Sequence, residues 1–395
     1  MNEARPGRNP WPRRLSIAAV VLVAIGAVGS VAVAWLLAER VAASFAIPQP
    51  PRPDDLEIVA VEGDVIRYRD TRPDVGPADV GRLAMKLPGG GWVYTTDEVS
   101  RQDDVSARRI DKVDGAPPKP GDRAQFDLSY FPADPQRGLG LEYEQVTFPG
   151  PLGDYPAWYV PGTGSTWLIY THGRGSTLRE GLRVVEIAHR TGHPALVISY
   201  RNDESAPRGD GMAKFGIDEW EDLEAAIVYA KTRGAVDVIL GAGSMGGAIT
   251  LSLFEHGSAQ AKSVRGVFLD SPALDIGRQS RFAADAMGVP GLIAELGFVL
   301  TSWRFGLDWE AMDYLSAVDD VMVPMLVLHG GADSLISVEA NRPVFEAMTK
   351  QGNATIEIIP GAHHLGIWNR DRVGFDRLVA QFLAKIGGDA GSAAP

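Results

Sequence analysis

The segment that most constrains this chain is a Gly-rich turn between an apolar strand and an apolar helix, at residues 236–248. It reads Val-Asp-Val-Ile-Leu-Gly-Ala-Gly-Ser-Met-Gly-Gly-Ala. One interpretation is the G-x-G-x-x-G phosphate-binding turn of a dinucleotide-binding fold at residues 241–246, with Asp270 as the ribose partner. The other is a sharp strand-to-helix turn that presents Ser244 as a nucleophile. The segment by itself is compatible with both.

Two later segments favour the nucleophile. Residues 321–333 form an apolar run that ends in a Gly-rich turn carrying Asp333, and residues 354–364 form another that ends in a turn carrying His364. The chain order Ser244, then a carboxylate, then a histidine is one of the known orders of a serine triad. The carboxyl ends of parallel strands are also where open α/β sheets place their sites.

An upstream segment points the same way. Residues 167–175 form an apolar strand that ends in His172-Gly173. A loop in this position supplies backbone N–H groups that stabilise a developing oxyanion. The dinucleotide interpretation leaves this turn and the two later turns without a role, so we favour the nucleophilic serine.

From about residue 140 to about residue 386 the chain resembles the α/β-hydrolase superfamily. The closest resemblance is to membrane-anchored serine hydrolases and serine-aminopeptidase-like lipases. The sequence departs from the strict G-x-S-x-G motif at Ala242, which takes the place of the first Gly. Alanine is small enough to let strand and helix approach closely, so we treat it as a tolerated variant. The resemblance rests on these residues: His172-Gly173, Gly243-Ser244-Met245-Gly246-Gly247, Asp333 and His364.

The triad roles follow from this resemblance. Ser244 is the expected nucleophile, although a serine also fits a tight Gly-rich turn for purely structural reasons. The family turn Pro-Gly-Ala-x-His selects His364 as the base. The side chain of His363 is then expected to point elsewhere, because side chains of consecutive residues diverge. Asp333 is expected to orient the imidazole. Asp270 is the alternative acid, and an Asx-turn is the structural alternative for Asp333.

The oxyanion hole is expected to consist of two backbone N–H groups, those of Met245 and Arg174. His172 and Gly173 are expected to shape the loop that holds the second group. The Arg174 side chain has no predicted catalytic role. It is interpreted as a surface charge or as a partner of Glu180 or Asp203.

The N-terminus predicts a membrane segment. Residues 15–38 carry no charge and are long enough to cross a bilayer as a helix. Arginines precede this run and acidic residues follow it, which predicts a cytoplasmic N-terminus and an extracytoplasmic body. A signal peptide cleaved near Ala32-Val-Ala34 is the alternative. The length of the run favours a retained anchor.

The predicted fold class is α/β: an α/β-hydrolase fold with a mostly parallel sheet, helices on both faces and a small helical cap. A transmembrane helix and a small β-rich region precede it. The predicted divisions are a cytoplasmic tail (1–14), a transmembrane signal-anchor helix (15–38), a Pro-rich linker (39–54), a β-rich accessory domain (55–138), the hydrolase domain (139–386, with the cap at 276–320) and a disordered tail (387–395).

Composition excludes several functions. The chain has 38 basic and 50 acidic residues, a formal charge of −12, which argues against nucleic acid as a partner. It has no cysteine, so disulfides, thiolate metal sites and cysteine nucleophiles are excluded. No metal-ligand or nucleotide-binding motif besides the 241–246 turn appears, so we expect neither a metal nor a cofactor.

The expected substrate is a small-molecule or lipid-like carboxylic ester. One alternative is a serine peptidase or amidase, in which acidic residues hold a substrate amine. The other is a non-catalytic binding module with the same fold. Acyl and leaving-group specificity, and the oligomeric state, are not encoded in any motif. The acidic candidates for an amine site are Asp203, Glu204 and Asp210.

Overall fold

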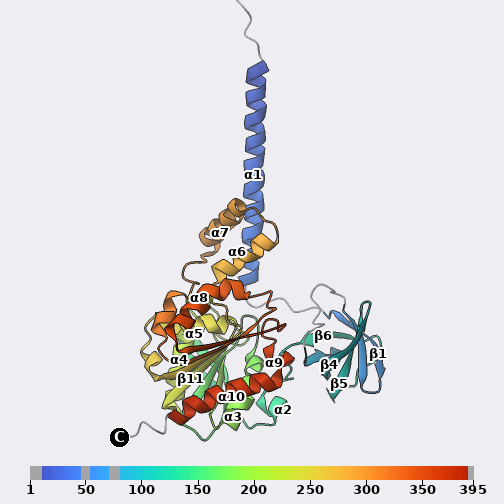
Figure 1. Ribbon diagram of the computed structural model, residues 1–395, viewed down its shortest axis with the longest axis vertical. Coiled ribbons are helices and arrows are strands. Elements are labelled where there is room, and N and C mark those ends of the chain that lie inside the picture. The colour runs from blue at the N-terminus through green and yellow to red at the C-terminus, as the bar shows by residue number, and fades with distance from the viewer. Residues whose placement is uncertain (1–10, 46–53, 71–80, 390–395) are drawn as a thin grey trace, which may run out of the picture. The chain divides into compact units, whose positions relative to one another are not determined.

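A computed structural model describes residues 11–45, 54–70 and 81–389 (Figure 1). Residues 1–10 of the predicted cytoplasmic tail, residues 46–53 of the Pro-rich linker and the last six residues of the predicted disordered tail lie outside these ranges. The chain divides into two compact units. One comprises Met1–Ala46 and Ser280–Trp309, and the other comprises Ile47–Gln279 and Glu310–Pro395.

The larger unit contains an eight-stranded sheet with the order β14-β13-β12-β11-β9-β10-β8-β7. The five strands from β14 to β9 and the neighbouring β10 are parallel, whereas β8 and β7 are antiparallel to their neighbours. The prediction of a mostly parallel sheet is confirmed. The strands are β7 (Glu144–Gly150), β8 (Gly153–Val160), β9 (Thr166–Thr171), β10 (Ala195–Ile198), β11 (Asp237–Gly243), β12 (Val264–Asp270), β13 (Met325–Gly330) and β14 (Ala354–Ile359).

Helices cover both faces of this sheet (Figure 1). Helices α3 and α10 pack together on one face, and α4 packs with α5 on the other. The helices of this unit are α2 (Pro135–Leu139), α3 (Leu182–Arg190), α4 (Trp220–Thr232), α5 (Met245–Glu255), α8 (Val338–Gln351), α9 (Ile367–Arg370) and α10 (Arg372–Asp389). The 3₁₀ turns are η1 (Pro88–Gly90), η2 (Leu178–Gly181), η3 (Ala259–Ser263) and η4 (Ser316–Asp320).

Strand β11 lies in the middle of the sheet, between β9 and β12. Every residue of β9 and β11 is buried, as expected for strands covered on both faces. The β-branched and apolar run at the start of the Gly-rich turn therefore forms a central strand. Its carboxyl end, where Ser244 follows, lies beside the carboxyl ends of β9 and β12.

The segment predicted to be β-rich forms a closed antiparallel barrel with the order β1-β2-β5-β4-β3-β6. Closure leaves no unpaired sheet edge. Its small core is built from alternating inward residues such as Leu56, Ile58 and Ile66. The strands are β1 (Leu56–Glu62), β2 (Val65–Asp70), β3 (Leu83–Lys86), β4 (Trp92–Gln102), β5 (Val105–Asp114) and β6 (Arg123–Asp127).

The smaller unit is helical. It contains α1 (Trp11–Phe45) and α7 (Gly291–Phe305), together with most of α6 (Ile276–Ala286). Within the described residues, the window Val28–Phe45 of α1 is long and apolar enough to cross a membrane, and only 22% of it is buried. Helices α6 and α7 and the turn η4 occupy the segment predicted as a cap.

Three predicted boundaries differ from the structure. Helix α1 starts before residue 15 and continues to Phe45, because no proline or glycine interrupts residues 39–45, which were predicted to begin the linker. Helix α10 extends to Asp389, so residues 387–389 are helical, where the sequence predicted disorder. Gly387 lies against the His193 ring, a tertiary contact that holds this end of the helix. Helix α2 crosses the predicted boundary between residues 138 and 139.

Candidate active site

Ser244 occupies a strained turn between β11 and α5. Its backbone has φ +49° and ψ −116°, a region that residues other than glycine rarely adopt. Two neighbouring glycines make the turn possible. A Cβ at Gly246 would collide with the carbonyl oxygen of Thr171, and one at Gly247 would lie 2.6 Å from Cβ of Pro272. The close approach of α5 to Thr171 in β9 and to Pro272 after β12 therefore requires glycine at these two positions, whereas Ala242 is accommodated in the buried strand.

Three predicted side chains form a hydrogen-bonded row. The Oγ of Ser244 lies 2.9 Å from Nε2 of His364, and Nδ1 of His364 lies 2.7 Å from Oδ2 of Asp333. With Nδ1–H donating to the carboxylate, Nε2 is free to accept the serine proton. The structure thus brings together residues that are far apart in the sequence. It places Asp333 rather than Asp270 against the imidazole.

Asp333 is held by the turn that follows β13. Its Oδ1 accepts the backbone N–H groups of Leu335 at 3.0 Å and Ile336 at 2.8 Å, which leaves Oδ2 for His364. The carboxylate is buried, so water does not compete for it. The Asx-turn that was the structural alternative for Asp333 is therefore present, and it orients the carboxylate toward the imidazole.

The loop that carries His364 is anchored by its neighbour Leu365. The Leu365 N–H donates to Oγ of Ser271 at 3.1 Å, and its carbonyl accepts from Nη1 of Arg183 at 2.6 Å. Ser271 in turn donates to Asp270 at 3.0 Å. Burial raises the pKa of the Asp270 carboxyl to about 6, with Arg183 and Ser271 opposing the rise. Asp270 thus supports the loop through Ser271.

The two backbone N–H groups predicted to form an oxyanion hole belong to the residues that follow Ser244 and Gly173. In the part of the chain that the structure describes, neither the N–H of Met245 nor that of Arg174 donates to a protein acceptor. The N–H of Gly173 is engaged, because it donates to Oε1 of Glu180 at 3.1 Å. A Cβ at Gly173 would lie 2.9 Å from Cβ of Ser244, so this loop passes directly over the serine.

The Arg174 side chain does not have the partners that the sequence suggested. Glu180 binds the Gly173 N–H and the Tyr170 hydroxyl, and Asp203 binds His172. Both acids therefore hold the loop itself. Burial lowers the pKa of the Arg174 guanidinium, whose Nη1 is buried without a protein hydrogen-bond partner.

His172 is a buried, ion-paired histidine. Its Nε2 lies 2.9 Å from Oδ2 of Asp203, and its Nδ1–H donates to the Gly173 carbonyl at 2.9 Å. The Tyr200 hydroxyl also donates to that carbonyl, at 3.1 Å. Burial lowers the pKa of His172, but Asp203 outweighs it and the pKa rises to about 9. The expected loop-shaping histidine is therefore an imidazolium at neutral pH.

This ion pair predicts a pH-dependent stability. Because the pKa of His172 is raised above its ordinary 6.5, the stabilisation is fully present below pH 6.5 and is lost as the pH rises through 9. The full difference corresponds to about 3 kcal/mol. We expect urea unfolding of the intact protein to show this loss between pH 6 and pH 10. In Asp203→Asn that component should disappear, and an unchanged pH dependence in the variant would contradict the assignment.

Sequence reasoning missed the side chains that hold the loops around Ser244 and His364. Glu180 and Asp203 were considered only for other roles, and Tyr200 and Ser271 were not considered. One signal was available for Asp203 and Ser271. Each follows the carboxyl end of a predicted strand, the position that selected Asp333 and His364. Glu180 had no such signal, because its role depends on the path of the loop after β9.

Comparison with solved structures identifies the fold. The esterase Pf2001 of Pyrococcus furiosus matches with a TM-score of 0.52 in one crystal form, at 18% identity, covering 65% of this chain and 95% of that one. A second crystal form gives a TM-score of 0.50 at 17% identity, covering 63% and 95%. A brefeldin A esterase, described as a bacterial homologue of human hormone-sensitive lipase, gives 0.48 at 18% identity, covering 63% and 78%. No protein-family model and no curated protein matches the sequence.

This chain has the α/β-hydrolase fold. The dinucleotide interpretation of residues 241–246 is thereby set aside, because the turn lies where this fold carries its nucleophile. Gly246 lets α5 approach the end of β9, and Gly247 lets it approach Pro272 after β12, so a phosphate is not needed to explain these glycines.

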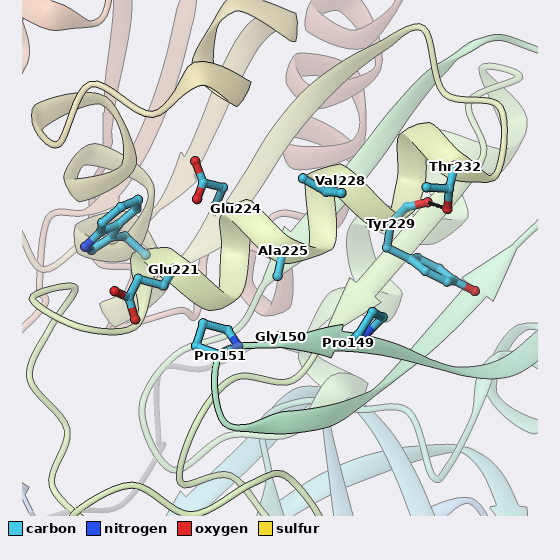
Figure 2. A pocket seen from close by; sticks show the side chains of 10 residues that line it. Pro149, Gly150, Pro151, Glu221, Glu224, Ala225, Val228, Tyr229 and Thr232 are labelled. Atoms are coloured by element: carbon cyan, nitrogen blue, oxygen red, sulfur yellow. Dashed lines mark hydrogen bonds between the residues drawn. The ribbon is translucent and has the colours of Figure 1, made fainter.

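One surface pocket of the hydrolase unit lies away from this site. It has a volume of about 470 Å³ and lies between the β7–β8 turn and α4 (Figure 2). Pro149 comes from β7 and Pro151 from the turn after it, and Glu221, Glu224 and Tyr229 come from the helix. None of the predicted site residues lines it. It is therefore not the place where an ester would meet Ser244.

Proposed function

We propose that this protein is a serine hydrolase that cleaves carboxylic esters through an acyl-enzyme on Ser244. The observation that carries the proposal is the hydrogen-bonded row from Ser244 through His364 to Asp333, at distances of 2.9 and 2.7 Å. A hydroxyl is activated for attack by a histidine whose Nε2 can accept its proton and whose Nδ1–H is held by a buried carboxylate. The strained turn presents the serine to that histidine.

In the acylation step, Oγ of Ser244 attacks the ester carbonyl carbon while its proton passes to Nε2 of His364. The carbonyl oxygen becomes an oxyanion, which accepts hydrogen bonds from the N–H groups of Met245 and Arg174. The C–O bond to the leaving group then breaks, and the imidazolium returns the proton to the departing alkoxide. Asp333 stabilises the imidazolium in between.

In the deacylation step, water attacks the acyl carbon and gives a proton to Nε2 of His364. The same two N–H groups stabilise the second oxyanion. The bond between the acyl carbon and Oγ then breaks, and the proton returns to Ser244. The products are a carboxylic acid and the regenerated enzyme.

Internal pairing of the nearby acids favours an ester over an aminopeptidase substrate. Two of the three acids that could hold a substrate amine have cationic partners of their own. Asp203 pairs with His172 at 2.9 Å, and Asp210 pairs with Lys214 at 2.9 Å. A positively charged amine would have to compete with those partners.

We further propose that α1 is a retained anchor, with the N-terminus in the cytoplasm and the catalytic unit outside. The uncharged run at residues 15–38, the arginines before it and the acids after it support this orientation. Purified membranes should contain a full-length chain that still carries an N-terminal tag. Recovery of a soluble protein whose N-terminus lies just after Ala34 would instead support signal cleavage.

The substrate class is tested with matched pairs of p-nitrophenyl esters and p-nitroanilides of the same acyl chain, from acetyl to longer acyl groups. We expect the purified full-length protein to hydrolyse the esters with a much higher kcat/KM than the anilides. Equal or higher kcat/KM for the anilides would favour the peptidase or amidase alternative. A folded protein that cleaves neither series would favour a binding module.

The assignment of the acid predicts different effects for two buried aspartates. Asp333→Asn should lower kcat about 10⁴-fold, because an amide facing Nδ1 favours the wrong imidazole tautomer. Asp270→Asn should have a much smaller effect on kcat, because Asp270 accepts a hydrogen bond from Ser271, whereas Asp333 is the acid that lies against the imidazole. Steady-state ester hydrolysis measures both. A larger loss in the Asp270 variant would reverse the assignment.

A further inference from the structure

Helix α7 in the smaller unit has two apolar faces. Ala294, Gly297 and Thr301 recur at helical spacing, and all three are buried. Leu292, Val299 and Trp303 recur at i, i+7 and i+11 on the opposite side, and they are 86%, 62% and 74% exposed. A helix with apolar residues on both sides is typical of a buried or membrane environment, and only one of these sides is covered by the described chain.

The buried face of α7 packs on α1 through small residues. A Cβ at Gly297 would lie 3.5 Å from Cβ of Leu37 and 3.6 Å from the carbonyl oxygen of Ala34. On α1, Ala34, Ala38 and Ala42 recur at every fourth residue and are all buried. Small residues at this spacing let two helices approach closely, which is the usual form of helix packing inside membranes.

These contacts fix the level of α7 along α1. Gly297 lies beside Ala34 and Leu37, within the uncharged run at residues 15–38 and also within the window Val28–Phe45. Ala34 and Leu37 lie in the membrane whether α1 crosses the bilayer with residues 15–38 or with Val28–Phe45. Gly297, which lies beside them, is then at the same depth. The exposed side of α7 then faces the same surroundings as the exposed side of α1.

The charges of α7 are compatible with that depth. The helix contains only two charged residues, and both are paired: Glu295 with Arg281 at 2.8 Å, and Arg304 with Glu39 at 2.9 Å. The Arg304 guanidinium also lies over the Trp35 ring, 4.4 Å from its centroid. Glu39 directly follows the uncharged run at residues 15–38, so with that span the ion pair lies at the membrane–water interface, where tryptophan is enriched.

Helix α6 differs from α7. It carries Arg278, Arg281 and Asp285, and Asp285 is exposed. An exposed carboxylate is costly in hydrocarbon, so α6 is suited to the level of the lipid headgroups. Helix α6 is therefore suited to the polar headgroup region of the membrane, and α7 to the apolar region beside it.

We propose that the face of α7 formed by Leu292, Val299 and Trp303 lies in the outer leaflet of the membrane, beside α1. The partner of this face is the lipid bilayer itself. The inference rests on the proposed anchoring by α1 and adds a second membrane-embedded segment. Because residues 280–309 continue at both ends into the catalytic unit, the enzyme would be attached to the bilayer through its cap as well as through its N-terminus.

The chain is well suited to a site-directed test because it contains no cysteine. Leu292→Cys and Val299→Cys place single thiols on the proposed lipid face. Val28→Cys is the matched control on α1, where the side chain is 69% exposed, and Val373→Cys is the aqueous control on α10, 80% exposed. Each full-length variant is labelled with bimane and reconstituted into phosphatidylcholine vesicles, with and without brominated acyl chains.

We expect brominated lipid to quench bimane at positions 292 and 299 to about the same fraction as at 28, and to leave position 373 unquenched. Quenching at 28 but not at 292 or 299 would overturn the proposal and leave the anchor intact. The absence of quenching at all four positions would remove the anchor and the proposal together. If bimane at 292 and 299 is shielded from aqueous iodide but not quenched by brominated lipid, a second copy of the chain covers the face, which also overturns the proposal.

The same samples separate this inference from the proposed catalysis. All four substitutions lie on exposed side chains outside the candidate active site, so labelling of the vesicles with a fluorophosphonate should be unchanged. Lipid quenching with no fluorophosphonate labelling would leave the membrane face standing and reject the serine hydrolase. Fluorophosphonate labelling without lipid quenching would support the serine hydrolase and reject the membrane face of α7.

Discussion

Replacing Ser244 with alanine is expected to abolish fluorophosphonate labelling and to lower kcat for ester hydrolysis by about 10⁶-fold. The hydroxyl supplies the atom that becomes acylated, and no other group in the row can take its place. Removing Oγ from a side chain that is 9% exposed creates little space, so the variant should fold. Mass spectrometry of the labelled wild-type protein should find the adduct on the peptide that contains residue 244.

A second serine on the adjoining helix is the matched control. Ser252 is buried in α5, and its Oγ donates to the Gly216 carbonyl at 2.8 Å, away from His364. Ser252→Ala should lose about 1 kcal/mol of stability and keep full fluorophosphonate labelling. Labelling that survives in Ser244→Ala would mean that another residue is the nucleophile. A folded wild-type protein that is not labelled would reject an activated serine altogether.

His364→Ala should lower kcat to nearly the same extent as Ser244→Ala, because the two residues act as one unit. Without Nε2 no group takes the proton from Oγ, and Asp333 is left with no imidazole to orient. The loss should appear in kcat more than in KM, since the imidazole is needed mainly in the transition state. Steady-state kinetics with one short-chain p-nitrophenyl ester measure both parameters.

The adjacent histidine provides the control for this prediction. His363 and His364 are equally available in the sequence, but it is His364 whose ring lies between Ser244 and Asp333. His363→Ala should keep kcat within about tenfold of the wild type, an allowance for displacement of the neighbouring loop. If His363→Ala were the inactive variant, the base would be assigned to the wrong histidine.

The α/β-hydrolase fold could be predicted because its signals are local and repeated. Apolar strands such as residues 236–240 end in glycine-containing turns. Each of these turns carries a candidate polar residue just after the carboxyl end of its strand. The order of Ser244, Asp333 and His364 along the chain is itself a pattern of the fold. These residues lie together in the structure, while their catalytic roles stay predictions until the variants are measured.

Other features were not predictable because they depend on contacts between distant segments. The buried pair of His172 and Asp203 joins two strand ends, and nothing in either local sequence marks the partner. The bond from Leu365 to Ser271 depends on the positions of β12 and of the loop after β14. The end of α10 was missed because the pair Gly387-Gly388 predicts disorder when the sequence is considered alone. The contact of Gly387 with His193 is visible only in the structure.

The sequence by itself determined the type of fold, the Gly-rich turn that carries Ser244 and the presence of an apolar N-terminal run. Each of these depends on the residue types within one short segment, and hydrophobic periodicity and the steric demands of glycine act over that distance. Only the tertiary structure showed that Asp333 and His364, which the resemblance had favoured, lie in one hydrogen-bonded row with Ser244, and which face of α7 is covered. These choices depend on side-chain direction at the meeting of segments that are far apart in the chain, and a hydrogen bond is sensitive to differences of a few tenths of an ångström.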